Sequence, residues 1–194
     1  MQGLLETIQK NIEFVGISIL LMVIVFAVAR GSEILIEKKT GVRLTSEKTK
    51  VNKIVIMAML SAIAVILMYF DFPIPFLAPG FYKLDFSEIP ILIGTFIMGP
   101  VSGIIMEAIK IVLKILLKGT TTGYVGELAN FCIGCCLVVP AGIIYKFKKS
   151  KKGAFIGIVV GIVLMAVAGA ILNYYVMLPF YEKFMPLEAI IEEG

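Results

Sequence analysis

The chain contains no histidine among its 194 residues and only three cysteines. The lack of histidine excludes Ser-His-Asp and Cys-His hydrolases, His-dependent zinc proteases and His-ligated haem. The sequence also lacks the G-x-x-x-x-G-K-[ST] loop, so the chain has no P-loop with which to hydrolyse ATP. It shows no internal repeat of the kind common in ion-coupled carriers. These absences favour a binding or assembly protein and predict no catalytic residues and no cofactor.

The three cysteines lie close together, at Cys132, Cys135 and Cys136. They fall within one turn of one predicted helix, so they do not form a disulfide framework. A zinc site would need at least one more ligand, and the pattern lacks a second pair. We interpret the cysteines as small packing residues and predict no metal site.

Charged residues are also scarce, at 16% of the chain, whereas 59% of the residues are hydrophobic and the mean hydropathy is +0.99. A bilayer core of ~30 Å needs about 20 apolar helical residues. Five apolar stretches reach or approach that length: Ile12–Ala29, Ile54–Phe70, Val101–Leu117, Val125–Tyr145 and Ala154–Leu178. A shorter one, Ile89–Met98, ends at Gly99-Pro100. The sequence therefore predicts an all-α polytopic membrane bundle, whose first stretch is a retained helix rather than a signal peptide.

Basic residues gather in two segments that connect predicted spans. Residues 30–53 hold Arg30, Lys38, Lys39, Arg43, Lys48, Lys50 and Lys53, and residues 146–152 hold Lys146, Lys148, Lys149, Lys151 and Lys152. Because loops rich in Lys and Arg stay in the cytoplasm, both segments are predicted on the cytoplasmic side rather than at a nucleic acid. Residues 71–88 and 118–124 and the N-terminus are then predicted outside.

The outer segment 71–90 is unusual in composition, since it holds four prolines and five aromatic residues. Proline restricts the backbone, and aromatic rings supply flat apolar contact area. Two interpretations stay open. The segment is either a semi-rigid lid that closes over a flat ligand, or a loop whose aromatic rings anchor it in the headgroup region.

Polar side chains within the predicted spans are the other candidates. Glu107, Lys110 and Lys114 share one helix face by their spacing of three and four. We favour a polar pocket there over a purely structural ion pair, because charges at membrane depth need partners or a wet cavity. Asn130 and Asn173 either bind a ligand with alternating donors and acceptors or tie helices together. Gly153, Gly157 and Gly161 predict a close-packing helix face.

Several separated motifs then resemble one family, the riboflavin-binding S component of energy-coupling factor (ECF) transporters. They are Phe72-Pro-Ile-Pro-Phe76, Leu84-Asp-Phe-Ser-Glu-Ile-Pro90, Phe96-Ile-Met-Gly-Pro-Val-Ser-Gly103, Gly126-Glu-Leu-Ala-Asn-Phe131, Ile171-Leu-Asn-Tyr-Tyr175 and Leu178-Pro179, in family order over about residues 53 to 185. The resemblance implies a small helical subunit of a prokaryotic plasma membrane that captures a vitamin from outside. It implies as partners a membrane coupling protein and two cytoplasmic ATPases.

The resemblance also implies roles for particular residues. Leu84 and Asp85 in the lid and Asn173 would bind the substrate, with Asn130 as a further contact, and the ribityl chain is expected near Lys110. The alanines Ala58 and Ala62 would contact the coupling protein. The flavin ring is expected to stack against aromatic side chains of the lid.

The chain departs from the family pattern at both ends. Residues 1–52 add an N-terminal helix and a basic linker, and residues 53–194 form the S-component domain, in which the last family helix is expected to be missing. Two other functions are weighed: an S component for another vitamin, and a membrane scaffold without a small-molecule site. An intramembrane enzyme finds support only in Glu107 with Lys110.

Overall fold

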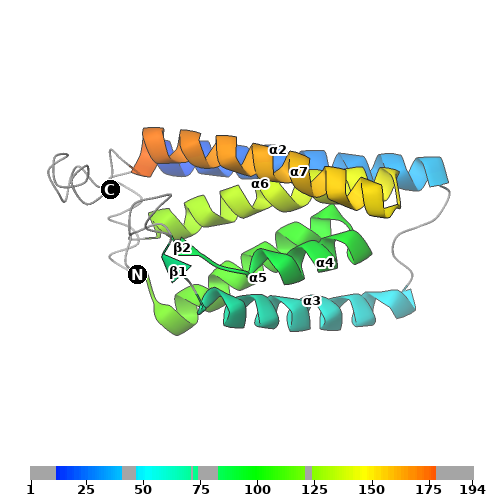
Figure 1. The fold of residues 1–194 in the computed structure, drawn as a ribbon, viewed down its shortest axis with the longest axis horizontal. Helices are drawn as coiled ribbons and strands as arrows, with labels where there is room; N and C mark the ends of the chain where they lie inside the picture. The colour runs from blue at the N-terminus through cyan, green and yellow to red at the C-terminus, as the bar shows by residue number, and fades with distance from the viewer. Residues whose placement is uncertain (1–11, 41–46, 71, 74–82, 121–123, 178–194) are drawn as a thin grey trace, which may run out of the picture.

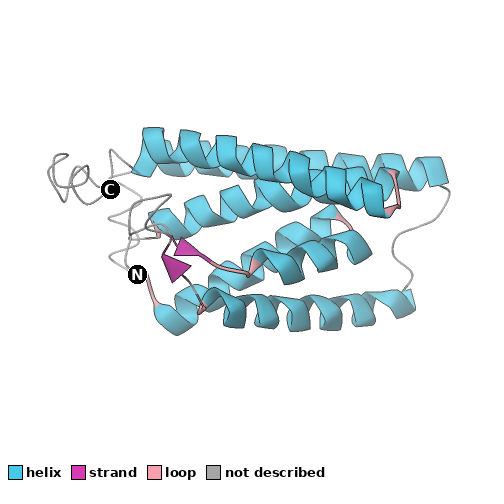
Figure 2. Cartoon of the chain, in the orientation of Figure 1, coloured by secondary structure: helices cyan, strands magenta, loops and turns pink. Residues whose placement is uncertain are grey.

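The computed structural model describes residues 12–40, 47–70, 72–73, 83–120 and 124–177, and these form a helical bundle (Figures 1 and 2). Its α-helices are α2 (Ile12–Thr40), α3 (Glu47–Met68), α4 (Glu88–Met98), α5 (Pro100–Lys118), α6 (Val125–Phe147) and α7 (Lys151–Leu172). Two short strands, β1 (Phe72–Pro73) and β2 (Lys83–Leu84), pair antiparallel, and a π-helical turn, η1 (Asn173–Met177), follows α7. The predicted all-α class is confirmed.

The first two helices extend beyond their predicted spans. Helix α2 continues from Ala29 to Thr40, through a stretch predicted to be linker, and α3 begins at Glu47 rather than Ile54. The prediction was wrong here because it followed only the apolar residues. Beyond Ala29 the inward face of α2 still carries buried side chains, Glu33 and Ile36, and that burial favours continuing the helix.

Four of the described helices are long and apolar enough to cross a membrane: α2 over Ser18–Lys39, α3 over Val51–Met68, α6 over Val125–Phe147, and α7 with its extension over Lys151–Tyr175. Helix α5 has nearly the predicted bounds, yet its four charged side chains distinguish it from these spans. Since Glu107 and Lys110 are completely buried, α5 keeps charge inside the bundle and away from lipid.

The two basic segments meet at one end of the bundle. This basic end, at the right of Figure 1, holds the end of α2, the start of α3, the α4–α5 turn and the α6–α7 link. The opposite end, called the lid end, holds β1–β2, the α5–α6 connection and the end of α7. The described helix ends beside the two basic segments therefore lie at the same end of the bundle, as a shared side of the membrane would require, and the cytoplasmic assignment stays a prediction.

Helix α6 is central, because it packs against α2, α4, α5 and α7. Its contact with α7 depends on the predicted glycine face. A Cβ placed on Gly157 would lie 2.8 Å from the Ala141 carbonyl oxygen, and one on Gly161 would lie 2.5 Å from that of Leu137. The two helix backbones thus touch where those glycines lie.

Helix α4 covers only part of the bundle's length (Figure 1). Its 11 residues span about 16 Å at 1.5 Å each, roughly half of a bilayer core. The completely buried Thr95 fixes it to its neighbours, since its side chain fills the space left by Gly103 on α5 and Gly142 on α6. The chain after β2 therefore enters the bundle before α4 begins.

Candidate functional site

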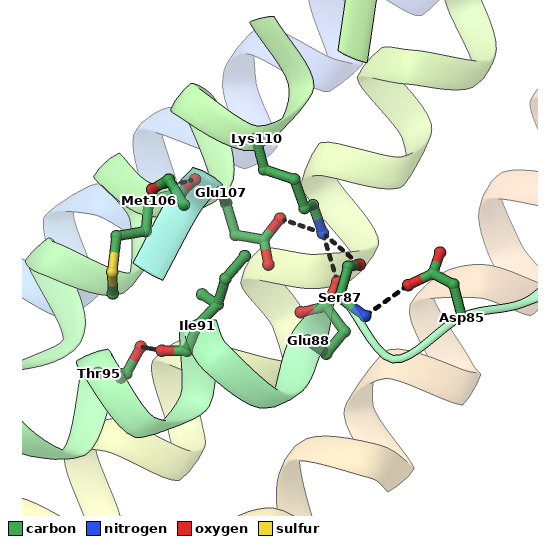
Figure 3. Close-up of polar contacts among 9 residues, drawn as sticks. Asp85, Ser87, Glu88, Ile91, Thr95, Met106, Glu107 and Lys110 are labelled. Carbon is green, nitrogen blue, oxygen red and sulfur yellow. Dashed lines mark hydrogen bonds and ion pairs between the residues drawn. The ribbon is translucent and has the colours of Figure 1, made fainter. Parts of the chain in front are cut away.

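A charged cluster lies where α4 begins, inside the bundle (Figure 3). The Lys110 ammonium, fully buried on α5, lies 2.6 Å from Glu88 Oε1 and 2.8 Å from Glu107 Oε2. It also donates to Ser87 Oγ at 3.4 Å. Three oxygen atoms thus surround an amine that carries three hydrogens. We call Ser87, Glu88, Glu107 and Lys110 the polar cluster.

The polar cluster is linked to the end of the lid segment. Asp85, half-buried, accepts a hydrogen bond from the Ser87 backbone N–H at 2.7 Å through Oδ1. This local turn brings residues 85–87 to the first turn of α4 (Figure 3). The outer segment 71–90 therefore joins the bundle next to the buried lysine.

The polar cluster has more acceptors than donors. Two carboxylates face a single ammonium, and Glu88 Oε2 is buried without a hydrogen-bond partner in the described part of the chain. The same holds for both Glu107 oxygens, although Oε2 lies within ion-pair distance of Lys110. Buried acceptors without a donor cost about 1–3 kcal/mol each. The arrangement is suited to receive hydroxyl groups or a proton.

A second group of charged side chains lies nearer the lid end and joins two helices. Lys114 pairs with Glu127 at 3.1 Å, and Glu127 also accepts from the Thr120 hydroxyl at 2.8 Å. Thr120 in turn accepts from the Tyr124 backbone N–H at 3.0 Å. Both carboxylate oxygens of Glu127 accept from a donor. Lys114, Thr120 and Glu127 therefore join α5 to α6 without leaving a Glu127 oxygen unpaired.

The two asparagines lie on neighbouring helices toward the lid end. Asn130 is half-buried on α6, one turn before Gly134, whose missing side chain makes room for the Glu107 carboxyl at 2.9 Å from a built Cβ. Asn130 therefore lies on the same face of α6 as Gly134, which contacts the Glu107 carboxyl of the polar cluster. Asn173, also half-buried, begins η1 where the α-helix changes to π-helix, a distortion frequent at functional sites.

The remaining predicted site residues belong to the outer segment and to α3. Leu84 pairs with Phe72 through the backbone in β1–β2, and the prolines and aromatics of residues 74–82 lie outside the described part of the chain. The alanines Ala58 and Ala62 are both exposed, one turn apart on α3, and they face away from the bundle. An exposed small-residue face permits another helix to approach closely.

Sequence reasoning missed Ser87 and Glu88, which were counted only as part of the outer segment. The signal was present, because an acidic residue at the start of an apolar helix marks a helix N-terminus. The sequence alone did not indicate how deep in the bundle α4 begins. In the structure, α4 begins inside the bundle rather than at its surface.

Comparison with known proteins places the chain among transport components. The family model described as "ECF transporter, substrate-specific component" matches residues 52–194. Riboflavin transporter FmnP of Bacillus subtilis is 40% identical over 146 residues, which are 75% of this chain and 76% of that protein. Riboflavin transporter RibU of Staphylococcus aureus is 42% identical over 139 residues, or 72% of each.

The fold comparison agrees with the sequence comparison. A solved structure described as the S component of a bacterial ECF transporter superposes with a TM-score of 0.61 at 39% identity. The match covers 73% of this chain and 83% of that one.

Proposed function

The chain belongs to the substrate-specific components of ECF transporters, and we propose that the vitamin it binds is riboflavin. The observation that carries this proposal is the identity of 40% and 42% with two riboflavin transporters over about three quarters of the chain. The chain is a transport component rather than an enzyme, and a multi-pass protein of a bacterial plasma membrane.

The proposed binding mode follows the two halves of the vitamin. Riboflavin has a flat ring system with a polar edge, and a ribityl chain with hydroxyl groups. The side-chain amides of Asn130 and Asn173 each offer two donors and one acceptor, which suits the polar edge of the ring. Leu84 and Asp85, at the root of the lid, are proposed to cover the ring from the outside.

The polar cluster refines the proposed place of the ribityl chain. Lys110 already has three oxygen atoms around its ammonium, so it is poorly suited to bind another acceptor. The unpartnered acceptors Glu88 Oε2 and Glu107 Oε1 are suited to the ribityl hydroxyls. We therefore assign direct contact to the carboxylates and a positioning role to Lys110.

Transport needs partners beyond this chain. We propose that the exposed alanines Ala58 and Ala62 contact a membrane coupling protein, and that two cytoplasmic ATPases supply the energy. The position of both alanines on the outer face of α3 supports this contact. Exchange of both for leucine should abolish transport in cells while leaving riboflavin binding to the isolated protein unchanged.

The substrate is tested by titrating the purified full chain with riboflavin and monitoring the quenching of flavin fluorescence. Saturable quenching is expected, and an excess of thiamin, biotin or folate should leave it unaltered. Displacement by one of these vitamins would assign a different substrate. Absence of binding to any of them would favour the scaffold alternative.

The site residues are tested with matched variants. Asn173→Ala and Asp85→Ala should each weaken riboflavin binding by ~1–3 kcal/mol, because each strands a polar partner on the ligand or in the lid turn. Asn52→Ala is the control, since Asn52 is exposed near the basic end. Equal affinity in all three variants would contradict the proposed binding mode.

A further inference from the structure

Helix α2 precedes the segment that the family model matches, yet it is packed into the bundle. The match begins at residue 52, whereas α2 covers Ile12–Thr40 and contacts α5 and α6. One face of α2 packs inward: Ser18, Ala29, Ser32, Glu33 and Ile36 are buried, and Leu21, Met22 and Val25 between them are half-buried. The opposite face exposes large apolar side chains, as expected for lipid contact.

A carboxylate of α2 contacts the start of α5. Glu33 Oε1 accepts a hydrogen bond from the Val101 backbone N–H at 3.2 Å. That N–H is one of the donors that a helix leaves without a partner in its first turn. The residue before the helix, Gly99, has no side chain with which to bond it. The cap of α5 therefore comes from a residue 68 positions earlier.

Two properties of Gly99 allow this contact. Its φ of +111° is a conformation that side-chain-bearing residues rarely adopt. A Cβ at Gly99 would also lie 2.6 Å from Glu33 Oε1. The α4–α5 turn thus leaves a space that the α2 carboxylate fills.

A cation on α6 holds the other side of the same turn. Lys146 donates to the Ile97 carbonyl at 3.0 Å, in the last turn of α4, and it is 8% exposed. An anion at the start of α5 and a cation at the end of α4 each oppose the partial charge of a helix terminus. We call Glu33 and Lys146 the turn clamp.

Helices α2, α5 and α6 together line an apolar cavity that is partly open to the surface. The cavity has a volume of about 150 Å³. It is lined by Leu21, Met22, Val25, Phe26, Ile104, Phe131, Cys132 and Cys135. Two native cysteines therefore face α2 across a short gap.

We propose that α2 is a required wall of the substrate-binding unit, and that Glu33 positions α5 so that Lys110 stays within the polar cluster. The cap fixes the start of α5, and Lys110 lies on the same rigid helix as that start. A shift of α5 along its axis would separate Lys110 from Glu88, because Glu88 belongs to α4. The binding consequence rests on the proposed function, whereas the placement of α2 does not.

The cap is tested by hydrogen exchange at the Val101 amide in the full-length protein. Glu33→Ala should speed this exchange at least ~tenfold, because the N–H loses its acceptor. Glu33→Gln keeps an acceptor oxygen and should show a smaller change. Arg30→Gln is the control, since Arg30 is exposed and touches Glu33 only at 3.5 Å. Unchanged exchange in Glu33→Ala would overturn the capping role.

The placement of α2 in the membrane is tested with the native cysteines. Met22→Cys and Val25→Cys should form disulfides with Cys132 or Cys135 on mild oxidation, detected as linked peptides by mass spectrometry. Val23→Cys, on the exposed face, should not. Linkage only between two chains, or equal linkage from Val23→Cys, would overturn packing of α2 within its own chain.

The functional consequence is read from riboflavin affinity in the same variants. Glu33→Ala should weaken binding about tenfold, or ~1.4 kcal/mol, and Arg30→Gln should not. Unaltered affinity in Glu33→Ala would show that α2 is packed but not required. If the unsubstituted chain binds no riboflavin, the proposed function fails, while exchange and cross-linking still decide the position of α2.

Discussion

The polar cluster and the turn clamp both bury charged side chains, but they differ in how completely those charges are satisfied. In the turn clamp, Glu33 accepts from Val101 and Arg30, and Lys146 donates to a helix-terminal carbonyl. In the polar cluster, Glu88 Oε2 and Glu107 Oε1 have no donor among the described residues while both carboxyl groups are ionised, and the two groups lie within hydrogen-bonding reach of each other. Charges that complete helix ends hold a fold together, whereas buried acceptors left over are where a ligand is expected.

The largest expected effect in this comparison comes from Lys110→Met. Removal of one partner from a buried ion pair typically costs about 3–5 kcal/mol, because the other charge stays buried alone. Here two carboxylates would lose their cation. We expect a large fall in the midpoint of thermal unfolding in detergent. The double variant Lys110→Met with Glu107→Gln should recover part of it, and no recovery would argue against electrostatic balance as the cause.

The next largest effect on stability is expected when a methyl group is placed in the space that the polar cluster occupies. Gly134→Ala places a methyl group 2.9 Å from the Glu107 carboxyl, and overpacking of this kind costs about 1–3 kcal/mol. Gly169→Ala is the matched control, because its nearest neighbour lies at 3.9 Å. Thermal unfolding should separate the two variants. Equal midpoints would mean that Glu107 has room to move.

A smaller effect distinguishes a binding role from a structural one. Glu88→Gln leaves one carboxylate for one ammonium, so stability should stay the same or rise. Riboflavin binding should fall about tenfold, or ~1.4 kcal/mol, because an acceptor proposed for the ribityl chain is lost. Fluorescence titration and thermal unfolding of one preparation measure both. A fall in stability with intact affinity would assign Glu88 to the structure.

The smallest effect is expected at the lid end. Lys114→Met should cost only about 1 kcal/mol, because the Lys114 side chain is 23% exposed and the buried Glu127 keeps its bond from Thr120. The measurement is again thermal unfolding, alongside Lys110→Met. A loss as large as that of Lys110→Met would erase the distinction between the two ion-pair groups.

The sequence predicted the helices and placed Glu107 and Lys110 on one helix face, because apolar length and a spacing of three are local properties. It favoured a polar pocket there over the ion pair that the structure shows. It also predicted the close-packed glycines of α7. It did not predict Glu88 as the second partner of Lys110, since that contact depends on how deep α4 begins. Nor did it predict that Glu33 caps α5, because a cap supplied across 68 residues leaves no local pattern.

The prediction of a linker after Ala29 was wrong for a related reason. A helix in a bundle ends where its packing ends, and α2 packs as far as Ile36 despite the charges nearby. The assignments of Leu84, Asn130 and Asn173 to the substrate, and of Ala58 and Ala62 to the coupling protein, remain predictions. They depend on a ligand and on a partner, and the variants at Asn173, Ala58 and Ala62 test three of them.

The shortness of α4 has a consequence for the energetics of import. Because α4 is only 11 residues long, residues 85–88 lie inside the bundle, about one helix half-span from the lid end, rather than at its outer edge (Figure 1). A ligand resting on them would already be enclosed by the helices on every side but the one it entered from. Capture at this depth would depend on affinity alone.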